Sequence, residues 1–203
     1  MKPLFITGIG TDIGKTIVSA VLVEKLDADY WKPVQSGELE NSDTRKVRNL
    51  VTNSISVFYD EAYKLTQPYS PHKSAALDGI EIDINNIIMP SGSNTLIIEG
   101  AGGLMVPLNS SHHVIDLIQK FKAEVILVVK HYLGSINHTL LSIEILKNKN
   151  IPVKGIIYNG EDSYSEEAIV NYCGLPVLGR LPYLSNITSV EIKNLGNQIH
   201  IDI

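Results

Sequence analysis

Gly8-Ile9-Gly10-Thr11-Asp12-Ile13-Gly14-Lys15-Thr16 is the most informative segment of this sequence. It follows a short apolar run, Leu4 to Thr7, and opens an amphipathic pattern from Lys15 to Lys25, so it joins a predicted buried strand to a predicted helix. The backbone N–H groups of such a glycine-rich loop point inward at an anion, and the helix N-terminus adds partial positive charge. The segment therefore predicts a phosphate-binding loop.

The residues that close this loop have the chemistry that a nucleoside triphosphate requires. Lys15 is expected to bridge the terminal phosphates, and the Thr16 hydroxyl is expected to ligate Mg²⁺. The spacing differs from the usual GxxxxGK[ST] pattern, because five residues instead of four separate Gly8 from Gly14. The alternative is a glycine-rich turn with an exposed lysine, but the agreement of strand, loop and helix favours phosphate binding.

Short apolar runs alternate with helical patterns along the rest of the chain. Strands are expected at residues 4–7, 30–34, 95–99, 124–129, 153–158 and 177–179, and helices at 15–25, 43–51 and 136–147. Strands that are apolar throughout predict an α/β fold of the P-loop NTPase type, a mainly parallel sheet with helices on both faces. Pro33 would place its run at a sheet edge or at a strand end. Residues 53–93 are expected to form loops and short helices, and the tail from Asn186 shows little pattern.

Composition limits the possible partners. The 203 residues are interpreted as a single domain, 1–203, and a net charge of −5 argues against a surface that coats nucleic acid. No apolar run is long enough to span a membrane, and the first residues do not have a signal-peptide layout, so we expect a cytoplasmic protein. Cys173 is the one cysteine, which excludes an internal disulfide and a multi-cysteine metal site.

Further ligands for a nucleotide are expected at the carboxyl ends of parallel strands. Lys32 lies near the end of the second predicted strand, Asp43 shortly after it, and Glu99 at the end of the third. An acid such as Glu99 suits Mg²⁺, and the glycines that follow it let backbone approach a ligand. Taken singly, these residues could instead be a surface lysine, a helix-start acid and a solvent-facing acid.

Two other classes of nucleotide-binding protein fit the sequence less well. A GTPase usually carries Asn-Lys-x-Asp, and the nearest segment, Asn148-Lys149-Asn150-Ile151, lacks the aspartate. Partition-type ATPases carry an additional lysine early in the phosphate loop, and positions 8–13 contain none.

With these residues assembled, the sequence resembles the dethiobiotin synthetase family over roughly residues 3–184. The resemblance rests on several short segments together: Thr7-Gly8 with Gly14-Lys15-Thr16, Lys32-Pro33-Val34 with Ser36-Gly37, Asn41-Ser42-Asp43, Ser70-Pro71-His72, Glu99-Gly100-Ala101-Gly102-Gly103 and Leu133-Gly134-Ser135-Ile136-Asn137-His138. Gly10 and Asp12 depart from the family's usual residues. A cobyrinate-type ligase domain is the runner-up, but such proteins usually add a glutaminase domain, for which 203 residues leave no room.

The resemblance implies an ATP-dependent cyclo-ligase. Its substrates would be 7,8-diaminononanoate and CO₂, with ATP and Mg²⁺ as cofactors, and its reaction would pass through a carbamate and a carbamic-phosphoric anhydride. It also implies a homodimer with active sites near the subunit interface.

The resemblance further assigns roles to individual residues. Catalytic roles fall to Lys15, Lys32, Thr11 and Ser36, and metal binding to Thr16, Asp43 and Glu99. The nucleotide would contact Gly8, Asp12, Ile13, Gly14, Lys15, Thr16, Glu99, Gly102 and Asn159, the last of these at the adenine. The substrate would contact Lys32 and Ser36, while its carboxylate tail would lie on Gly134, Ser135, Ile136 and Asn137 of the partner subunit. Ser135 could at the same time be the N-cap of its helix.

Overall fold

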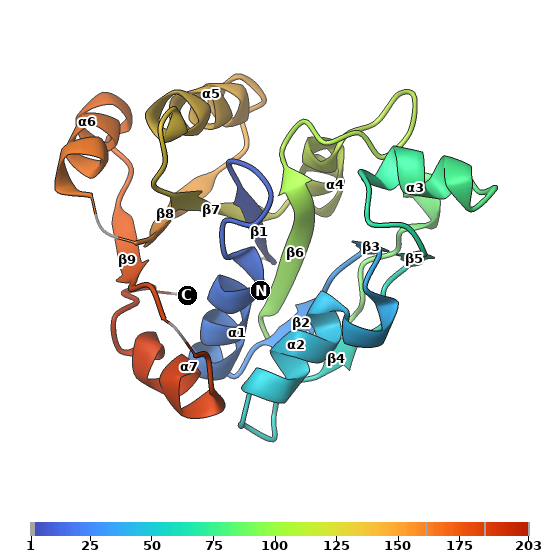
Figure 1. Cartoon of the computed structure of the whole chain (residues 1–203), viewed down its shortest axis with the longest axis horizontal. Helices are drawn as coiled ribbons and strands as arrows, with labels where there is room; N and C mark the ends of the chain where they lie inside the picture. The colour runs from blue at the N-terminus through green and yellow to red at the C-terminus, as the bar shows by residue number, and fades with distance from the viewer. Residues whose placement is uncertain (1–2, 161, 185, 203) are drawn as a thin grey trace.

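A parallel seven-stranded sheet forms the centre of the molecule, in a computed structural model that describes residues 3–160, 162–184 and 186–202 (Figure 1). Its strands are β1 (Leu4–Gly8), β2 (Asp29–Trp31), β4 (Phe58–Tyr59), β6 (Leu96–Gly103), β7 (Glu124–Lys130), β8 (Val153–Asn159) and β9 (Val177–Leu181). They lie in the order β4-β2-β6-β1-β7-β8-β9, and β3 (Val34–Ser36) pairs with β5 (Tyr63–Leu65) in a separate parallel ribbon. The predicted α/β fold is confirmed.

Helices cover both faces of this sheet (Figure 1). They are α1 (Lys15–Leu26), α2 (Asp43–Leu50), α3 (Pro71–Leu77), α4 (Val114–Phe121), α5 (Ser135–Asn148), α6 (Ser163–Cys173) and α7 (Ser189–Gly196), with 3₁₀ turns at Leu39–Asn41 and Ile84–Asn86. Helices α1, α2 and α7 share one apolar core with the sheet, and α4, α5 and α6 pack on the other side. None of the helices in the described ranges combines the length and apolar character needed to span a membrane.

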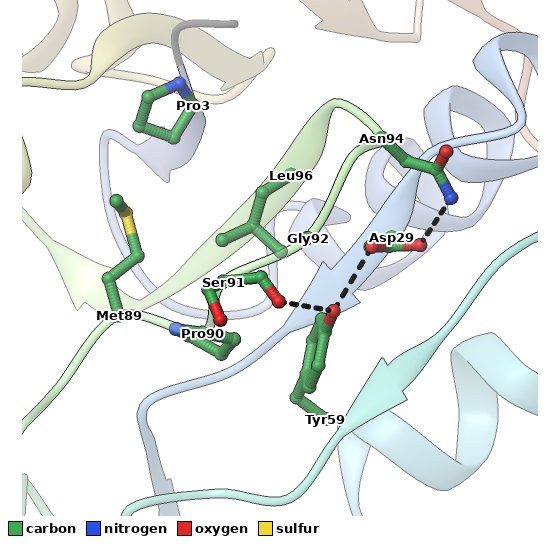
Figure 2. Close-up of a pocket in the computed structure, with 9 residues that line it drawn as sticks. All are labelled: Pro3, Asp29, Tyr59, Met89, Pro90, Ser91, Gly92, Asn94 and Leu96. Carbon is green, nitrogen blue, oxygen red and sulfur yellow. Dashed lines mark hydrogen bonds between the residues drawn. The ribbon is translucent and has the colours of Figure 1, made fainter.

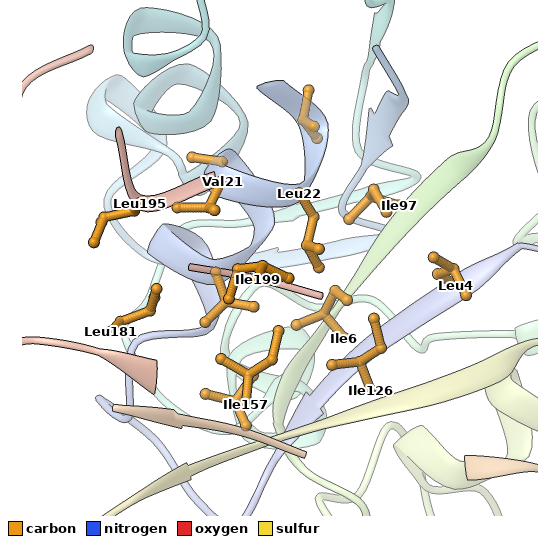
Figure 3. Packing of buried hydrophobic residues seen from close by; sticks show 14 of the residues in the cluster. Leu4, Ile6, Val21, Leu22, Ile97, Ile126, Ile157, Leu181, Leu195 and Ile199 are labelled. Carbon is orange, nitrogen blue, oxygen red and sulfur yellow. The ribbon is translucent and has the colours of Figure 1, made fainter. Parts of the chain in front are cut away.

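Successive side chains of a strand point to opposite faces of the sheet, so each strand contributes residues to both apolar cores. In β1, Leu4 and Ile6 point to the α1 side and belong to the same core cluster as Val21 and Leu22 (Figure 3), whereas Phe5 packs on the α4 side. Strand residues that are buried in both directions leave no polar face, which explains why the runs are apolar throughout. Because β1 lies centrally, the loop that follows it is anchored by the best-buried part of the molecule.

Two expectations about chain segments need correction. The run predicted at 30–34 is split, because Pro33 has no N–H to donate and β2 ends at Trp31. Pro33 therefore marks a strand end, but β2 is an interior strand between β4 and β6, not an edge strand. Residues 53–93 also contain the short strands β4 and β5, besides the expected loops and short helices.

The C-terminal tail is better ordered than its pattern indicated. The Glu191 carboxylate accepts from the Thr188 N–H at 2.7 Å, and the Thr188 hydroxyl accepts from the Glu191 N–H at 3.4 Å, forming a capping box that starts α7. Ile192, Leu195 and Ile199 are buried in the core beneath α1. The tail therefore covers the helix that follows the phosphate loop.

Candidate active site

The phosphate loop connects the end of β1 to the first turn of α1. Gly14 is the N-cap of α1 and has a φ of 94°, which a residue with a Cβ adopts only under strain. An added Cβ would also lie 2.4 Å from Asn159 Nδ2. The ammonium of Lys15 turns back over the loop and donates to the Gly10 carbonyl at 2.8 Å. The loop is thus closed on itself by its own lysine.

Burial dominates the electrostatics of Lys15, which is 7% exposed. Removal from water lowers the pKa of Lys15 to about 8, although the nearby carboxylates of Glu99 and Asp43 oppose the shift. Phosphate groups beside the ammonium would favour its charged form further. The position therefore suits a cation that has an anion as its partner.

Glu99 is held in place by three partners and is 1% exposed. Its Oε1 accepts from the Thr16 hydroxyl at 2.9 Å and lies 3.3 Å from Lys32 Nζ, and its Oε2 accepts from the Tyr30 hydroxyl at 2.9 Å. Burial, and then the charge of Glu99, raises the pKa of Tyr30 well above its usual range, so this phenol is a hydrogen-bond donor. Thr16 and Glu99, two of the three expected metal ligands, are therefore in direct contact.

Lys32 lies between two carboxylates. Its ammonium contacts Asp43 Oδ2 as well as Glu99 Oε1, and the other Asp43 oxygen lies 3.5 Å from Lys46 Nζ. Burial works to lower the pKa of Lys32, but Glu99 and Asp43 together outweigh it and raise the pKa above its ordinary value. The pKa of Asp43 is lowered, because Lys32 and Lys46 outweigh the opposing effect of burial. Lys32, Lys46 and Asp43 are therefore charged at neutral pH.

Two cavities adjoin at this cluster and have Thr11, Asp12, Lys32, Asp43, Lys46 and Gly102 in common. One, of about 370 Å³, follows the phosphate loop from Thr11 to Thr16 and reaches Glu99 and Asn159. The other, of about 490 Å³, is also lined by Ser36 and Tyr69. The Ser36 hydroxyl is buried and has no hydrogen-bond partner among the described residues. A ligand in the second cavity could supply that partner.

Asn159 lies where the sequence placed it, at the carboxyl end of β8. Its side-chain amide donates to the Ile13 carbonyl at 3.0 Å, so it contacts the phosphate loop directly. Gly8, Asp12 and Gly102 also lie at the loop or its cavities. The structure thus gathers the predicted nucleotide-binding residues at one end of the sheet.

The segment from Gly134 to Asn137 does not join this cluster within one chain. It lines a separate cavity of about 810 Å³ with His131, Tyr132, Leu133, Asp162 and Ser165. Gly134 is the N-cap of α5, with a φ of 100°, and Ser135 is the first helical residue, 2% exposed. The interpretation of Ser135 as the N-cap is therefore wrong, because the positive φ that ends this turn favours glycine.

Sequence reasoning missed several residues that support the site. The sequence predicts only a strand around Tyr30 and no role for Gln35. In the structure, Gln35 Oε1 accepts from the Asp43 N–H at 3.3 Å and its Nε2 donates to the Gly37 carbonyl at 3.0 Å. Lys46 follows Asp43 by three residues on α2, a spacing that brings side chains together and could have revealed it. No comparable local signal identifies Tyr30 or Gln35.

A glycine-rich loop joins a central parallel strand to a helix and carries Lys15 and Thr16, and the Thr16 hydroxyl contacts Glu99 of the neighbouring strand β6. This arrangement defines a P-loop nucleotide-binding protein. The sequence model of the AAA domain matches residues 2–191. Among solved structures, a ParA family ATPase from Chlorobium tepidum TLS has a TM-score of 0.56 and 14% identity, over 98% of this chain and all of that one. The MinC:MinD complex of Aquifex aeolicus has a TM-score of 0.57 and 16% identity, over 97% of this chain and 86% of that one. These likenesses concern the fold alone.

Curated relatives define the family more narrowly. An ATP-dependent dethiobiotin synthetase BioD from Christiangramia forsetii is 53% identical, with 94% of this chain and 93% of the relative covered. The protein of that name from Cytophaga hutchinsonii is 53% identical, with 88% and 87% covered, and the one from Rhodopseudomonas palustris strain HaA2 is 42% identical, with 95% and 91% covered. The chain belongs to the dethiobiotin synthetase family, and the prediction of a ligase is confirmed.

Proposed function

We propose that the protein closes the ureido ring of dethiobiotin from 7,8-diaminononanoate and CO₂, converting ATP to ADP and phosphate, as one step of biotin biosynthesis in the cytoplasm. The observation that carries this proposal is the meeting of Lys15, Thr16, Lys32, Asp43 and Glu99 around two adjoining cavities. One cavity is the place for the nucleotide, and the other is the place for the diamine and CO₂. The high identity to named relatives supports the assignment of the reaction.

The reaction requires three bond-forming steps. One amine attacks CO₂ and loses a proton, giving a carbamate, and a carbamate oxygen then attacks the γ-phosphorus while the bond to ADP breaks. The second amine attacks the carbonyl carbon of the anhydride and loses a proton, and the C–O bond to phosphate breaks. Because the reacting groups are mainly anionic, charge neutralisation and alignment are the protein's main contributions.

The residues of the site can meet those demands. Lys15 and Lys32 would neutralise the transferred phosphoryl group and the carbamate, since both ammonium groups border the nucleotide cavity. Thr11 and Ser36 line the second cavity, and their hydroxyls would donate to carbamate or phosphate oxygens. The unpartnered Ser36 hydroxyl supports this role. Asn159 would contact the nucleotide at its adenine, and the phosphate loop would hold the phosphates.

The oxygen donors near Lys32 fit magnesium. Thr16, Asp43 and Glu99 offer one hydroxyl and two carboxylates, and Mg²⁺ commonly uses one or two carboxylates together with substrate phosphates. When bound, Mg²⁺ would offset negative charge on the phosphates. The described residues contain no group of three or more His, Cys, Asp or Glu side chains suited to a metal, so phosphate oxygens would complete the coordination.

A homodimer would bring the separate α5 cavity into use. The N-terminus of α5 carries partial positive charge that suits a carboxylate, although the Ser135 N–H itself donates to the Tyr132 carbonyl at 2.9 Å. In one chain, residues 134–137 line neither of the cavities around Lys32. The carboxylate tail of the diamine would therefore lie on this segment of the partner subunit. We also propose that each chain is a single domain, because the helices on both faces pack against the same seven-stranded sheet.

A product assay tests the proposal. The purified protein is incubated with 7,8-diaminononanoate, ¹³C-bicarbonate and MgATP, and the products are analysed by mass spectrometry together with phosphate release. We expect dethiobiotin that carries one ¹³C at the ureido carbon, and phosphate release only when both diamine and bicarbonate are present. Intact ATP binding without this product would overturn the ligase reaction. Phosphate release that needs no diamine would indicate a nucleotide-switch ATPase instead.

A further inference from the structure

The Tyr30 hydroxyl is a buried polar group to which the proposed reaction gives no role. Tyr30 is fully buried in β2, and its ring packs near Phe58, with centroids 6.4 Å apart. Its hydroxyl donates to Glu99 Oε2 at 2.9 Å. A phenylalanine would fill almost the same volume and would satisfy the same apolar neighbours. The hydroxyl therefore distinguishes Tyr30 from a phenylalanine only through its hydrogen bond to Glu99.

The two oxygens of Glu99 have different partners. Oε1 accepts from Thr16 and lies near Lys32, so it faces the nucleotide cavity, whereas Oε2 is directed at Tyr30. With one oxygen held on each side, the plane of the carboxylate is fixed. Without Tyr30, Oε2 would be a buried, charged oxygen without a partner, and the carboxylate could rotate.

We propose that Tyr30 is a positioning residue that holds Glu99 so that a single oxygen, Oε1, is presented to the divalent cation. The proposal rests on the proposed function, because it takes Glu99 as a magnesium ligand. Partners that orient a metal-binding carboxylate affect metal affinity, commonly by tenfold or more. A fixed, one-oxygen carboxylate also favours Mg²⁺ over Ca²⁺, because Ca²⁺ readily accepts both oxygens of one carboxylate.

Metal binding without turnover tests this role. The protein is saturated with ADP, Mn²⁺ is added, and free Mn²⁺ is measured by electron paramagnetic resonance while Mg²⁺ or Ca²⁺ competes. We expect Tyr30→Phe to bind Mg²⁺ roughly tenfold more weakly and to lose less affinity for Ca²⁺. Tyr158→Phe is the matched control, because Tyr158 is also fully buried and its hydroxyl has no hydrogen-bond partner among the described residues. Unchanged Mg²⁺ affinity in Tyr30→Phe, or an equal loss in Tyr158→Phe, would overturn the proposal.

A double-mutant cycle separates action through Glu99 from a general effect on the core. Once Glu99→Gln has removed the charged partner, adding Tyr30→Phe should change metal binding no further, and an additional loss would overturn the proposal. Glu99→Gln keeps the size of the side chain and removes its charge, and circular dichroism of the single and double variants shows whether each is folded. If Tyr30→Phe alone does not fold, comparison of the double variant with Glu99→Gln still reports whether Tyr30 affects metal binding independently of the Glu99 charge. If Glu99→Gln itself binds Mn²⁺ normally, the assignment of Glu99 as a ligand fails. Formation of the ureido ring is measured separately and reports on the proposed reaction.

Discussion

The side-chain amide of Asn159 donates a hydrogen bond to the main-chain carbonyl of Ile13 at 3.0 Å, although 146 residues separate them. This contact joins the carboxyl end of β8 to the phosphate loop. It also places Asn159 Nδ2 directly beside Gly14, where no side chain can be added without a collision. The shape of the loop is therefore determined partly by a residue from the other half of the chain.

The first prediction concerns Gly14. Gly14→Ala introduces a Cβ at a φ of 94° and 2.4 Å from Asn159 Nδ2, so either the loop or Asn159 must move. We expect ATP binding, measured by calorimetry, to weaken at least tenfold, and the free energy of unfolding to fall by about 1–3 kcal/mol. Gly79→Ala is the matched control, because Gly79 has a φ of 71° but open space around it. Similar ATP affinity in both variants would contradict the role of the Asn159 contact.

The second prediction concerns the charge of Lys32. Lys32→Met keeps the length of the side chain but leaves Asp43 and Glu99 without the ammonium that lies between them. We expect turnover to fall by about a hundredfold or more, and stability to fall by roughly 3 kcal/mol while the protein stays folded. Added Mg²⁺ should restore part of the thermal stability, because a cation can then occupy the space between the carboxylates.

Circular dichroism, thermal unfolding with and without Mg²⁺, and the ureido-ring assay measure these three effects. Lys154→Met is the control, since Lys154 also forms an ion pair, with Glu124. This pair lies at the amino-terminal ends of β8 and β7, away from the candidate site. A Lys32→Met protein that turns over normally would contradict the role of the ammonium. One that does not fold would show that Lys32 is a structural residue.

The sequence predicts what local patterns determine. The phosphate loop and the helix that begins at Asp43 follow from glycine spacing and a helical pattern, and both are present in the structure. The end of the strand expected at residues 95–99 is wrong, because β6 continues through the glycines to Gly103, and Glu99 therefore lies inside the strand. Tyr30 and Gln35 could not be predicted, because their partners, Glu99 and Asp43, are chosen by strand order and by a loop path that no local pattern specifies. The contacts of residues 134–137 at the start of α5 could not be predicted for a different reason, because their proposed partner is a second chain.

The third prediction separates stability from activity. The buried carboxylate of Asp29, at the start of β2, accepts from Asn94 Nδ2 at 2.9 Å and from the Tyr59 hydroxyl at 3.2 Å (Figure 2). It also accepts from the Val57 N–H at 2.9 Å. This group lies beside a small cavity of about 180 Å³, at the ends of the strands opposite the candidate site.

Asp29→Ala therefore should lower the free energy of unfolding by roughly 2–4 kcal/mol, because three donors lose their acceptor. The turnover of the remaining folded protein should not change. Urea unfolding and the product assay at low temperature measure the two effects, and the exposed Asp60 provides the comparison in Asp60→Ala. A selective loss of turnover would mean that the two ends of the sheet are coupled.

The last prediction tests whether each active site uses two chains. Lys15→Ala removes the loop lysine, and Asn137→Asp adds a negative charge at the start of α5, where it favours the helix but repels a substrate carboxylate. Each variant should be inactive by itself. A heterodimer of the two contains one site with an intact Lys15 and an intact partner segment, so random exchange of subunits should restore about one quarter of the unmodified activity. Mixing Lys15→Ala with Lys32→Ala should restore no activity, because Lys15 and Lys32 of any one site belong to the same chain and each chain then lacks one of them. If heterodimers form, as native mass spectrometry would show, and activity does not return, the substrate tail does not lie on the partner subunit.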